Sequence, residues 1–310
     1  MNESINCPIC ESTARLHFKQ TKDYQYSTNY QTDYNKCSSV NCLHLFSHNT
    51  EIQNISDLYT EYTTHTIFRK NILSQMIALY VYIIESIFSF TKINREKKAL
   101  LPMAFNKSST LLDYGCGSGE FLWNLSQSQW TNISVFDFDL KALEAAKSRG
   151  LNCLLTNDLS LLQSYDIITL NHVIEHIPDV NSLFHNLSKM KKNNGVIILK
   201  TPNCSCINAS IFGKFWRGLE SPRHFHLFTP ESLVILTKKH NFNVVQIKTG
   251  NRILFGSFLE SWIIACSHFN LSAKIAKIFA LLTYPFLVIT HSIISFINPF
   301  RNEEIILVVA

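Results

Sequence analysis

The chain has 310 residues, of which 46% are apolar and only 16% are charged, and its formal net charge is +5. The positive charges are spread along the chain without a basic stripe interleaved with aromatic side chains, so we expect no nucleic acid partner. Nine cysteines and an N-terminal stretch without an apolar signal segment indicate free thiols and a cytoplasmic protein.

The first 50 residues are typical of a small module held together by a metal, because two cysteine pairs enclose a polar and aromatic stretch. Four thiolates in two pairs suit a tetrahedral structural zinc in a zinc-ribbon-like fold. The candidate ligands are Cys7, Cys10, Cys37 and Cys42. The second pair has an unusually wide spacing, so His44 or His48 is an alternative ligand, and two unrelated cysteine pairs are the other interpretation.

Residues 51–107 are interpreted as a helical linker. Within it, residues 66–92 are apolar on nearly all sides and are interrupted by Glu85. A charge in the middle of the run disfavours a transmembrane span. We therefore expect a buried or interfacial helix.

Strands and helices alternate between residues 108 and 252. Predicted strands lie at 110–113, 133–139, 151–158, 165–173, 195–203 and 242–249, and a seventh lies at 303–310. Apolar strands separated by helices are typical of a parallel sheet covered on both faces. The predicted fold is therefore α/β, a Rossmann-like, doubly wound seven-strand sheet whose last strand, within residues 300–310, follows a hydrophobic helical insertion at 253–299.

Three glycines at every second position follow the first of these strands, Gly115, Gly117 and Gly119 in "LLDYGCGSGEFL", and acids flank them at Asp113 and Glu120. A dinucleotide-binding loop offers backbone N–H groups to a pyrophosphate, and two flanking acids disfavour that anion. S-adenosylmethionine carries sulfonium and ammonium cations and no phosphate, and glycines let the backbone pass close to its amino acid part. The loop therefore indicates S-adenosylmethionine as cofactor, bound by Asp113 and the three glycines.

Polar side chains at the ends of the next strands extend this predicted cofactor site. Asp137 is placed to accept both ribose hydroxyls, a feature that nicotinamide-binding folds share. Asp158 is placed to accept from the adenine amino group, with a surface turn as the alternative. Asn171 and His172 end the fourth strand, at the edge where ligands bind in such sheets.

The ordered motifs "LLDYGCGSGEFL", "VFDFD", "YDIITLNHVIEHIPD" and "GVIILKTPN" resemble those of class I S-adenosylmethionine-dependent methyltransferases, over residues 108–250. The stretch "WRGLESPRHFHLFTPESL" also resembles a subgroup linked to cell-envelope biosynthesis, some of whose members carry an N-terminal cysteine knuckle. The resemblance implies an antiparallel last strand and methyl transfer to an envelope glycan or lipid-linked precursor. A quinone-type precursor is a further candidate acceptor for an enzyme whose apolar insertion faces lipid. A non-catalytic module that binds zinc and S-adenosylmethionine is the alternative, and a nicotinamide-dependent oxidoreductase is a third.

His224 is the predicted catalytic residue, as a general base for an oxygen or nitrogen acceptor. His226 is its competitor, but alternate residues of an extended loop point in opposite directions, so we expect only one of the two to face the pocket. Arg223 is expected to orient an anionic acceptor. The alternative is that this loop is a structural latch.

The stretch "HVIEH" matches the H-x-x-E-H pattern of zinc proteases, which requires both histidines on one helix face. Here it leaves a predicted strand, and Pro178 follows two residues later. We expect Glu175 and His176 to form a structural turn pair.

The insertion at 253–299 is almost continuously apolar and is flanked by Lys274, Lys277 and Arg301. A seventh strand in the same sheet requires the chain to return to its starting side, which excludes a single membrane crossing. We expect a helical hairpin on the membrane surface, and hence a protein peripheral on the cytosolic face that meets a small-molecule or lipid-linked acceptor. A soluble subdomain packed on helix 66–92, or a dimer interface, is the alternative.

Overall fold

The computed structural model describes residues 5–24, 28–47, 58, 72–88, 106–154, 164–250 and 255–310. Asp158, the predicted adenine contact, lies outside these ranges. So does most of the predicted linker at 51–107.

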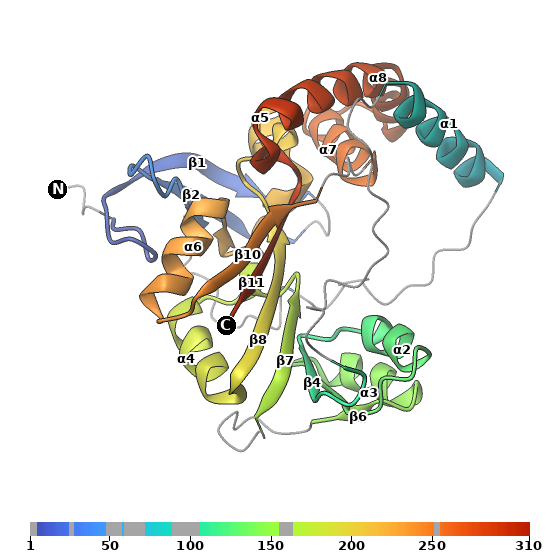
Figure 1. The fold of residues 1–310 in the computed structure, drawn as a ribbon. Coiled ribbons are helices and arrows are strands. Elements are labelled where there is room, and N and C mark those ends of the chain that lie inside the picture. The colour runs from blue at the N-terminus through green and yellow to red at the C-terminus, as the bar shows by residue number, and fades with distance from the viewer. Residues whose placement is uncertain are drawn as a thin grey trace.

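A seven-stranded sheet forms the centre of the molecule, with the strand order β10-β11-β8-β7-β4-β5-β6 (Figure 1). Its strands are β4 (Leu111–Tyr114), β5 (Ile133–Phe136), β6 (Asn152–Cys153), β7 (Tyr165–Asn171), β8 (Lys191–Pro202), β10 (Val244–Thr249) and β11 (Glu304–Val309). Strand β11 runs antiparallel to both β8 and β10, and the pairs among β4 to β8 are parallel. The predicted Rossmann-like sheet with an antiparallel last strand is confirmed.

Both faces of this sheet are covered by helices, which explains its continuous apolar strands. The neighbours Ile167 and Ile168 point to opposite faces and belong to different cores. The core on one face includes residues of α4 (Val180–Met190) and α6 (Pro230–Lys239). The other includes residues of α2 (Glu120–Ser126) and α3 (Leu140–Ser148).

The N-terminal cysteine module is built into the larger domain. Its strands are β1 (Ala14–Lys22), β2 (Gln31–Cys37) and β3 (Leu45–Ser47). The two-residue strand β9 (His226–Leu227) pairs with β3 and completes an antiparallel sheet of order β1-β2-β3-β9. Cys7 and Ile9 also share a core with Phe228 and Leu233, so the loop that ends in β9 (residues 220–227) and the residues after it join the module to the domain of the seven-stranded sheet.

Four helices pack together around a third core: α1 (Ile72–Phe88), α5 (Ile207–Phe212), α7 (Phe255–His268) and α8 (Ala273–Ile297). Short 3-10 helices complete the described chain: η3 (Ile174–His176), η4 (Gly213–Phe215), η5 (Arg217–Leu219) and η6 (Pro299–Arg301). The predicted insertion is thus two helices, α7 and α8, between β10 and β11.

Because β7, β8 and β10 run in the same direction, their carboxyl ends lie at one edge of the sheet, which we call the carboxyl edge. Strand β11 starts at this edge, since Glu304 pairs with Pro202 at the end of β8. The insertion leaves the sheet after β10 and returns at β11, so α7 and α8 stand beyond the carboxyl edge (Figure 1).

Candidate active site

The glycine loop connects β4 to α2 and requires glycine at both ends. Gly115, Gly117 and Gly119 all have positive φ angles, of 76°, 52° and 74°, which non-glycine residues rarely adopt. A Cβ atom on Gly115 would lie 2.4 Å from Val173 Cγ2, and one on Gly119 would lie 2.6 Å from Leu151 Cδ1. The loop therefore presents bare backbone at the carboxyl edge.

Asp137 lies directly beside this loop, although 20 residues separate it from Gly117 in the sequence. Its Oδ2 accepts a hydrogen bond from the backbone N–H of Gly117 at 2.8 Å, and its Oδ1 accepts from that of Asp139 at 2.9 Å. The backbone N–H of Gly115 also donates to the carbonyl of Phe136 at 2.8 Å. The structure thus brings together the loop and the acid that the sequence assigns to one ligand.

Phe138, the residue after Asp137, is a further candidate cofactor contact that no motif in the sequence marks. Its side chain is 62% exposed, and its ring packs edge-on against Tyr114 at 5.8 Å and Phe136 at 5.0 Å between centroids. An exposed aromatic ring next to Asp137, the predicted ribose ligand, offers a flat apolar surface. The signal available in the sequence was an aromatic residue directly after the acid.

Asp113 lies beneath the loop and is 2% exposed. Its Oδ1 accepts hydrogen bonds from Thr169 Oγ1 at 2.6 Å and from Asn171 Nδ2 at 3.1 Å. Burial raises the pKa of its carboxyl to about 7. In this structure Asp113 and Asn171 join the ends of β4 and β7 below the loop, and their direct contact with the cofactor stays a prediction.

His172 lies at the carboxyl edge between two acids, Glu175, which is three residues away, and Glu304, which is distant in the sequence. Its Nδ1 lies 3.2 Å from Glu175 Oε1, and its Nε2 lies 2.8 Å from Glu304 Oε1. Burial alone would lower the pKa of the imidazole, but the hydrogen bonds to these carboxylates raise it to about 10. No local pattern in the sequence marks Glu304, because it is the first residue of a strand and its partner His172 lies 132 residues earlier.

His224, the predicted base, is 3% exposed and lies behind the edge. Its Nδ1 donates to the carbonyl of Gly218 at 2.8 Å, and its ring meets the ring of His176 edge-on at 4.6 Å between centroids. Candidate metal-ligating atoms of Glu175, His176 and His224 lie within 4.8 Å of one another. Burial lowers the pKa of His224 to about 4, so the ring is neutral near pH 7. Its predicted role as a general base stays a prediction, and its burial is the observation against it.

The loop around His224 differs from expectation in two respects. Arg223 is fully buried and pairs with Asp23 at 2.7 Å, so the expected role of orienting an anionic acceptor is wrong: a long-range ion pair already holds its guanidinium. His226 does not point away from the core either, because its ring is 3.0 Å from His44 Nε2 on one side and 3.0 Å from the Pro178 carbonyl on the other. Both histidines face inward because this loop is enclosed between the module and η3 (Ile174–His176).

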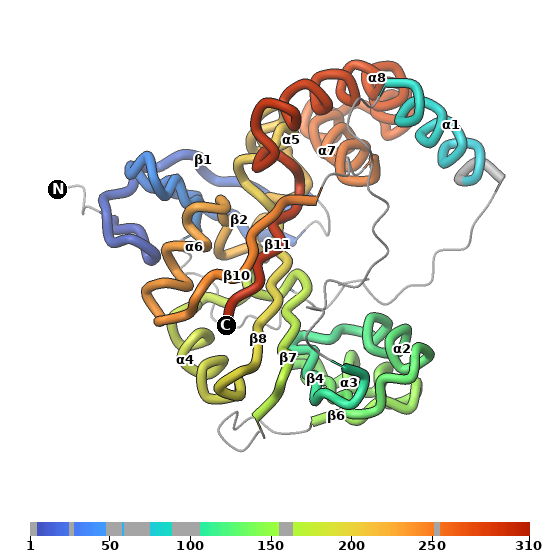
Figure 2. The backbone as a smooth tube through the Cα atoms, in the orientation of Figure 1, coloured from blue at the N-terminus to red at the C-terminus, as the bar shows by residue number. Residues whose placement is uncertain are grey.

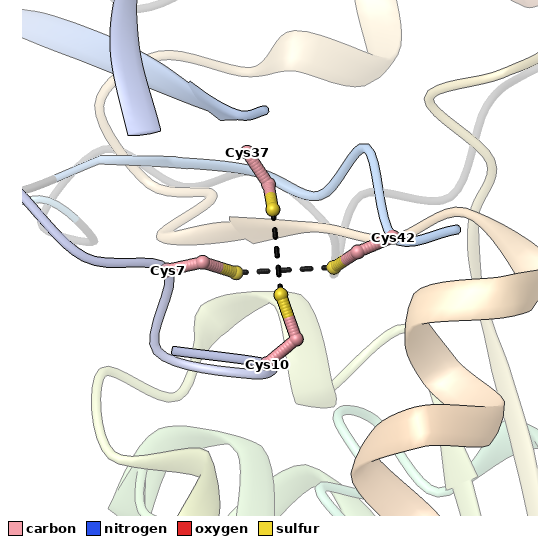
Figure 3. Close-up of side chains that lie close together, drawn as sticks. All are labelled: Cys7, Cys10, Cys37 and Cys42. Atoms are coloured by element: carbon pink, nitrogen blue, oxygen red, sulfur yellow. Dashed lines mark hydrogen bonds between the residues drawn. The ribbon is translucent and has the colours of Figure 1, made fainter. Parts of the chain in front are cut away.

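The four predicted zinc ligands converge at the base of the N-terminal module (Figure 3). The sulfur atoms of Cys7 and Cys42 are 3.8 Å apart, and those of Cys10 and Cys37 are 3.4 Å apart. Tetrahedral zinc with Zn–S bonds of about 2.3 Å separates its sulfurs by about 3.8 Å, so the arrangement fits this ion. The hydrogen bond between Cys7 and Cys42 lowers the pKa of the Cys7 thiol to about 5 and raises that of Cys42, and burial raises the pKa of Cys37 to about 11. Four ligating thiolates would therefore require the charge of the metal ion itself.

Comparison with known proteins identifies the family. The profile of the methyltransferase domain family matches residues 88–247, just over half of the chain. The chain therefore belongs to this family; it is a class I S-adenosylmethionine-dependent methyltransferase, and S-adenosylmethionine is its cofactor.

Individual relatives are more distant. The chain is similar to a protein named ubiquinone biosynthesis O-methyltransferase from Pelagibacter ubique, with 24% identity over 195 residues, 58% of this chain and 77% of that protein. A protein of the same name from Salmonella paratyphi A is 26% identical over 103 residues, 30% of this chain and 42% of that protein. Among solved structures, geranyl diphosphate C-methyltransferase from Streptomyces coelicolor aligns with a TM-score of 0.44 at 12% identity, over 76% of this chain and 80% of that chain.

Proposed function

We propose that the chain O-methylates a hydroxylated precursor with an apolar tail, of the quinone type or linked to a lipid. The observation that carries the proposal is the position of the apolar helices α7 and α8 beyond the carboxyl edge, which also holds the glycine loop and His172. An acceptor with a long apolar tail gains free energy by leaving its tail among such side chains while its head group reaches the donor.

The relatives support the same acceptor class. Those from Pelagibacter ubique and Salmonella paratyphi A are named for O-methylation in ubiquinone biosynthesis. The chain spans 77% of the first and 42% of the second, so the likeness favours quinone-type acceptors over envelope glycans without identifying one.

The chemistry needs alignment more than covalent help from the protein. S-adenosylmethionine supplies an electrophilic methyl group whose C–S bond breaks as the bond to the acceptor oxygen forms, and the hydroxyl proton passes to a base or to water. The glycine loop and Asp137 hold the donor in place, which is the main catalytic contribution in such a transfer. The acids beside the glycine loop, Asp137 and Glu120, favour the cationic donor over its neutral product, whereas burial raises the pKa of Asp113 to about 7 and so reduces its negative charge.

We assign a structural zinc to Cys7, Cys10, Cys37 and Cys42 as part of the same proposal. The convergence of four sulfur atoms from the chain before β1, from β2 and from the turn before β3 supports this assignment. Four protein ligands leave no open coordination position, so the ion would hold the module in place and take no part in methyl transfer.

The proposal is tested with the full chain, S-adenosylmethionine and two acceptors that share a dihydroxybenzene ring, one with a polyprenyl tail and one without. We expect kcat/KM to be at least about tenfold higher for the tailed compound. A lipid-linked sugar serves as the third acceptor, and Asp137→Asn serves as the donor-site control. Equal rates with and without the tail, or methylation of the sugar alone, would reject a quinone-type acceptor.

A further inference from the structure

Helices α1, α7 and α8 form one layer although α1 lies nearly 200 residues before α8. Tyr80 Oη donates a hydrogen bond to the carbonyl of Leu281 at 2.6 Å, and Tyr284 Oη donates to Glu85 Oε1 at 2.7 Å. Figures 1 and 2 show these helices grouped at one end of the molecule, beyond the end of β8. We call them the helical layer.

The outer side of the helical layer is apolar along both long helices. On α1 the exposed side chains recur at spacings of three and four residues, and on α8 at spacings of four and seven, so each helix presents one continuous stripe. The stripes are formed by Met76, Leu79, Ile83 and Ile87 on α1 and by Ile278, Leu282, Phe286, Ile293 and Ile297 on α8. Leu282 and Phe286 are 65% and 70% exposed. An apolar stripe of this length that is exposed to water marks an interaction site.

The charges around these stripes indicate the chemistry of the partner. The only acid in α1 and α8 is Glu85, which the Tyr284 hydroxyl engages. The exposed charges of the two helices are Lys274 and Lys277, both in the first two turns of α8. The preceding turn also exposes Phe269 and Leu271. Apolar side chains next to lysines, without an exposed acid on these two helices, match a surface with anionic headgroups above hydrocarbon.

The packing of α8 fixes how it would meet a bilayer. By length and composition α8 is the one helix among the described residues that is able to cross a membrane. Its other side is buried against the protein through Ala276, Ala280, Tyr284, Leu287, Val288 and His291. Its C-terminal end is tied to the segment just before β11 by the hydrogen bond from Ser295 Oγ to Asn302 Oδ1 at 2.8 Å. A helix held in this way lies along a membrane surface and does not cross it.

We propose that the outer side of the helical layer docks on an anionic lipid bilayer, with Lys274 and Lys277 at the headgroups and the stripes of α1 and α8 in the interfacial region. The layer stands beyond the carboxyl edge, and the short segment after α8, which contains η6, leads to Glu304 at the start of β11, beside His172. Docking therefore places the methyl-donor site next to the lipid phase, with the chain peripheral to the membrane.

The experiment is flotation of the full, zinc-loaded chain with vesicles of phosphatidylcholine alone and of phosphatidylcholine with phosphatidylglycerol. We expect stronger binding to the anionic vesicles. The double variant Leu282→Glu/Phe286→Glu is expected to weaken binding to both kinds at least about tenfold, because ionised carboxylates do not enter the apolar region. Leu16→Glu/Val245→Glu, which changes exposed apolar positions on β1 and β10 and adds the same two negative charges, is the matched control and is expected to bind like the wild type.

A second pair of variants tests the charges independently. Lys274→Gln/Lys277→Gln is expected to remove most of the preference for anionic vesicles, whereas Lys189→Gln/Lys238→Gln, with the same net charge, keeps it. Titration with S-adenosylhomocysteine reports whether each variant is folded. Since flotation requires no methyl transfer, the docking surface and the acceptor class fail independently. The proposal would be overturned if the wild type did not bind vesicles. It would also be overturned if the wild type were a dimer and the Leu282→Glu/Phe286→Glu variant were a monomer, because this surface would then be a dimer interface.

Discussion

Glu304, the first residue of β11, holds the imidazole of His172 at the carboxyl edge with a distance of 2.8 Å between Oε1 and Nε2. The second imidazole nitrogen faces Glu175 Oε1 at 3.2 Å. His172 itself has a φ of 56°, a conformation that costs free energy in a non-glycine residue. The contact between Glu304 and His172 therefore ties β11, the strand after the apolar insertion, to the segment after β7, next to the glycine loop.

This pair predicts a particular pH dependence of stability. Hydrogen bonds to the two carboxylates raise the pKa of His172 to about 10 from an ordinary value of 6.5. Because the pKa of His172 is higher in the folded state than in the unfolded state, protonation of its imidazole stabilises the fold. This stabilisation is complete below pH 6.5 and is lost as the pH rises to about 10. We expect the excess thermal stability of the wild type over His172→Gln to shrink across that range. Unfolding midpoints measured from pH 6 to 10.5 check this.

The control for this prediction is Asn193→Gln, at an exposed position of β8 that carries no ionisable side chain before or after the change. It is expected to differ from the wild type by the same amount at every pH. A constant difference between the wild type and His172→Gln would mean that the imidazolium contributes nothing to folding.

Replacing Gly119 is expected to abolish tight donor binding. In Gly119→Ala, the new methyl group meets Leu151 Cδ1 at 2.6 Å and Ala146 Cβ at 2.9 Å, and the residue must hold a φ of 74°. Gly150→Ala has the same backbone strain, with a φ of 79°, but nothing lies within 4 Å of its Cβ. The strain costs each variant about 1 kcal/mol of unfolding free energy, and only Gly119→Ala adds a clash. Calorimetric titration with S-adenosylhomocysteine should show at least about tenfold weaker binding for Gly119→Ala alone, and equal affinities would contradict this account of the loop.

Asp137→Asn is expected to weaken donor binding at least about tenfold while the fold persists. Asparagine has one acceptor oxygen where the carboxylate has two, so the variant loses one of the hydrogen bonds that the N–H groups of Gly117 and Asp139 donate, and the charge that favours a cationic donor is lost. Asp139→Asn is the comparison, because Asp139 caps α3 by accepting from the N–H of Lys141 and asparagine caps nearly as well. If both variants bound S-adenosylmethionine like the wild type, Asp137 would not be a ribose ligand.

The sheet was predictable from the sequence because its signals are local. Consecutive apolar residues such as Ile167 and Ile168 indicate a strand buried on both faces, and the glycines at 115, 117 and 119 mark the loop that follows the first strand. The position of Asp137 beside the glycine loop was predictable for the same reason, since a strand end is visible in the sequence and parallel strands bring their ends together.

The surroundings of His224 were not predictable in this way. Arg223 is buried because Asp23, 200 residues earlier, neutralises its charge. Strand β9 forms because His226 and Leu227 pair with β3 of the module. These contacts depend on how the module packs on the domain, which no short pattern encodes. Glu304 is a similar case, because its importance arises only when β11 inserts between β8 and β10.

The cysteine module and the loop that ends in β9 are expected to loosen together when the metal is removed. Thr229, the N-cap of α6, donates a hydrogen bond from Oγ1 to the carbonyl of Cys42 at 2.7 Å, and Ser47 N–H donates to the carbonyl of Phe225 at 2.9 Å. If zinc holds Cys42 in place, chelation releases both contacts. We expect faster amide hydrogen exchange in 225–233, with little change in α4.

Metal analysis and one pair of variants complete this test. The purified chain is expected to contain about one zinc ion per molecule, in line with four-coordinate structural sites. Cys42→Ser should lose the ion and reproduce the exchange pattern of the chelated wild type. Cys153→Ser, which changes a half-buried cysteine of β6, should retain the ion because it lies outside the cluster. If amide exchange in 225–233 did not change on chelation, the hydrogen bonds that involve Cys42 and Ser47 would persist without the metal. The shared core of Ile9, Phe228 and Leu233 would then be what holds the module in position.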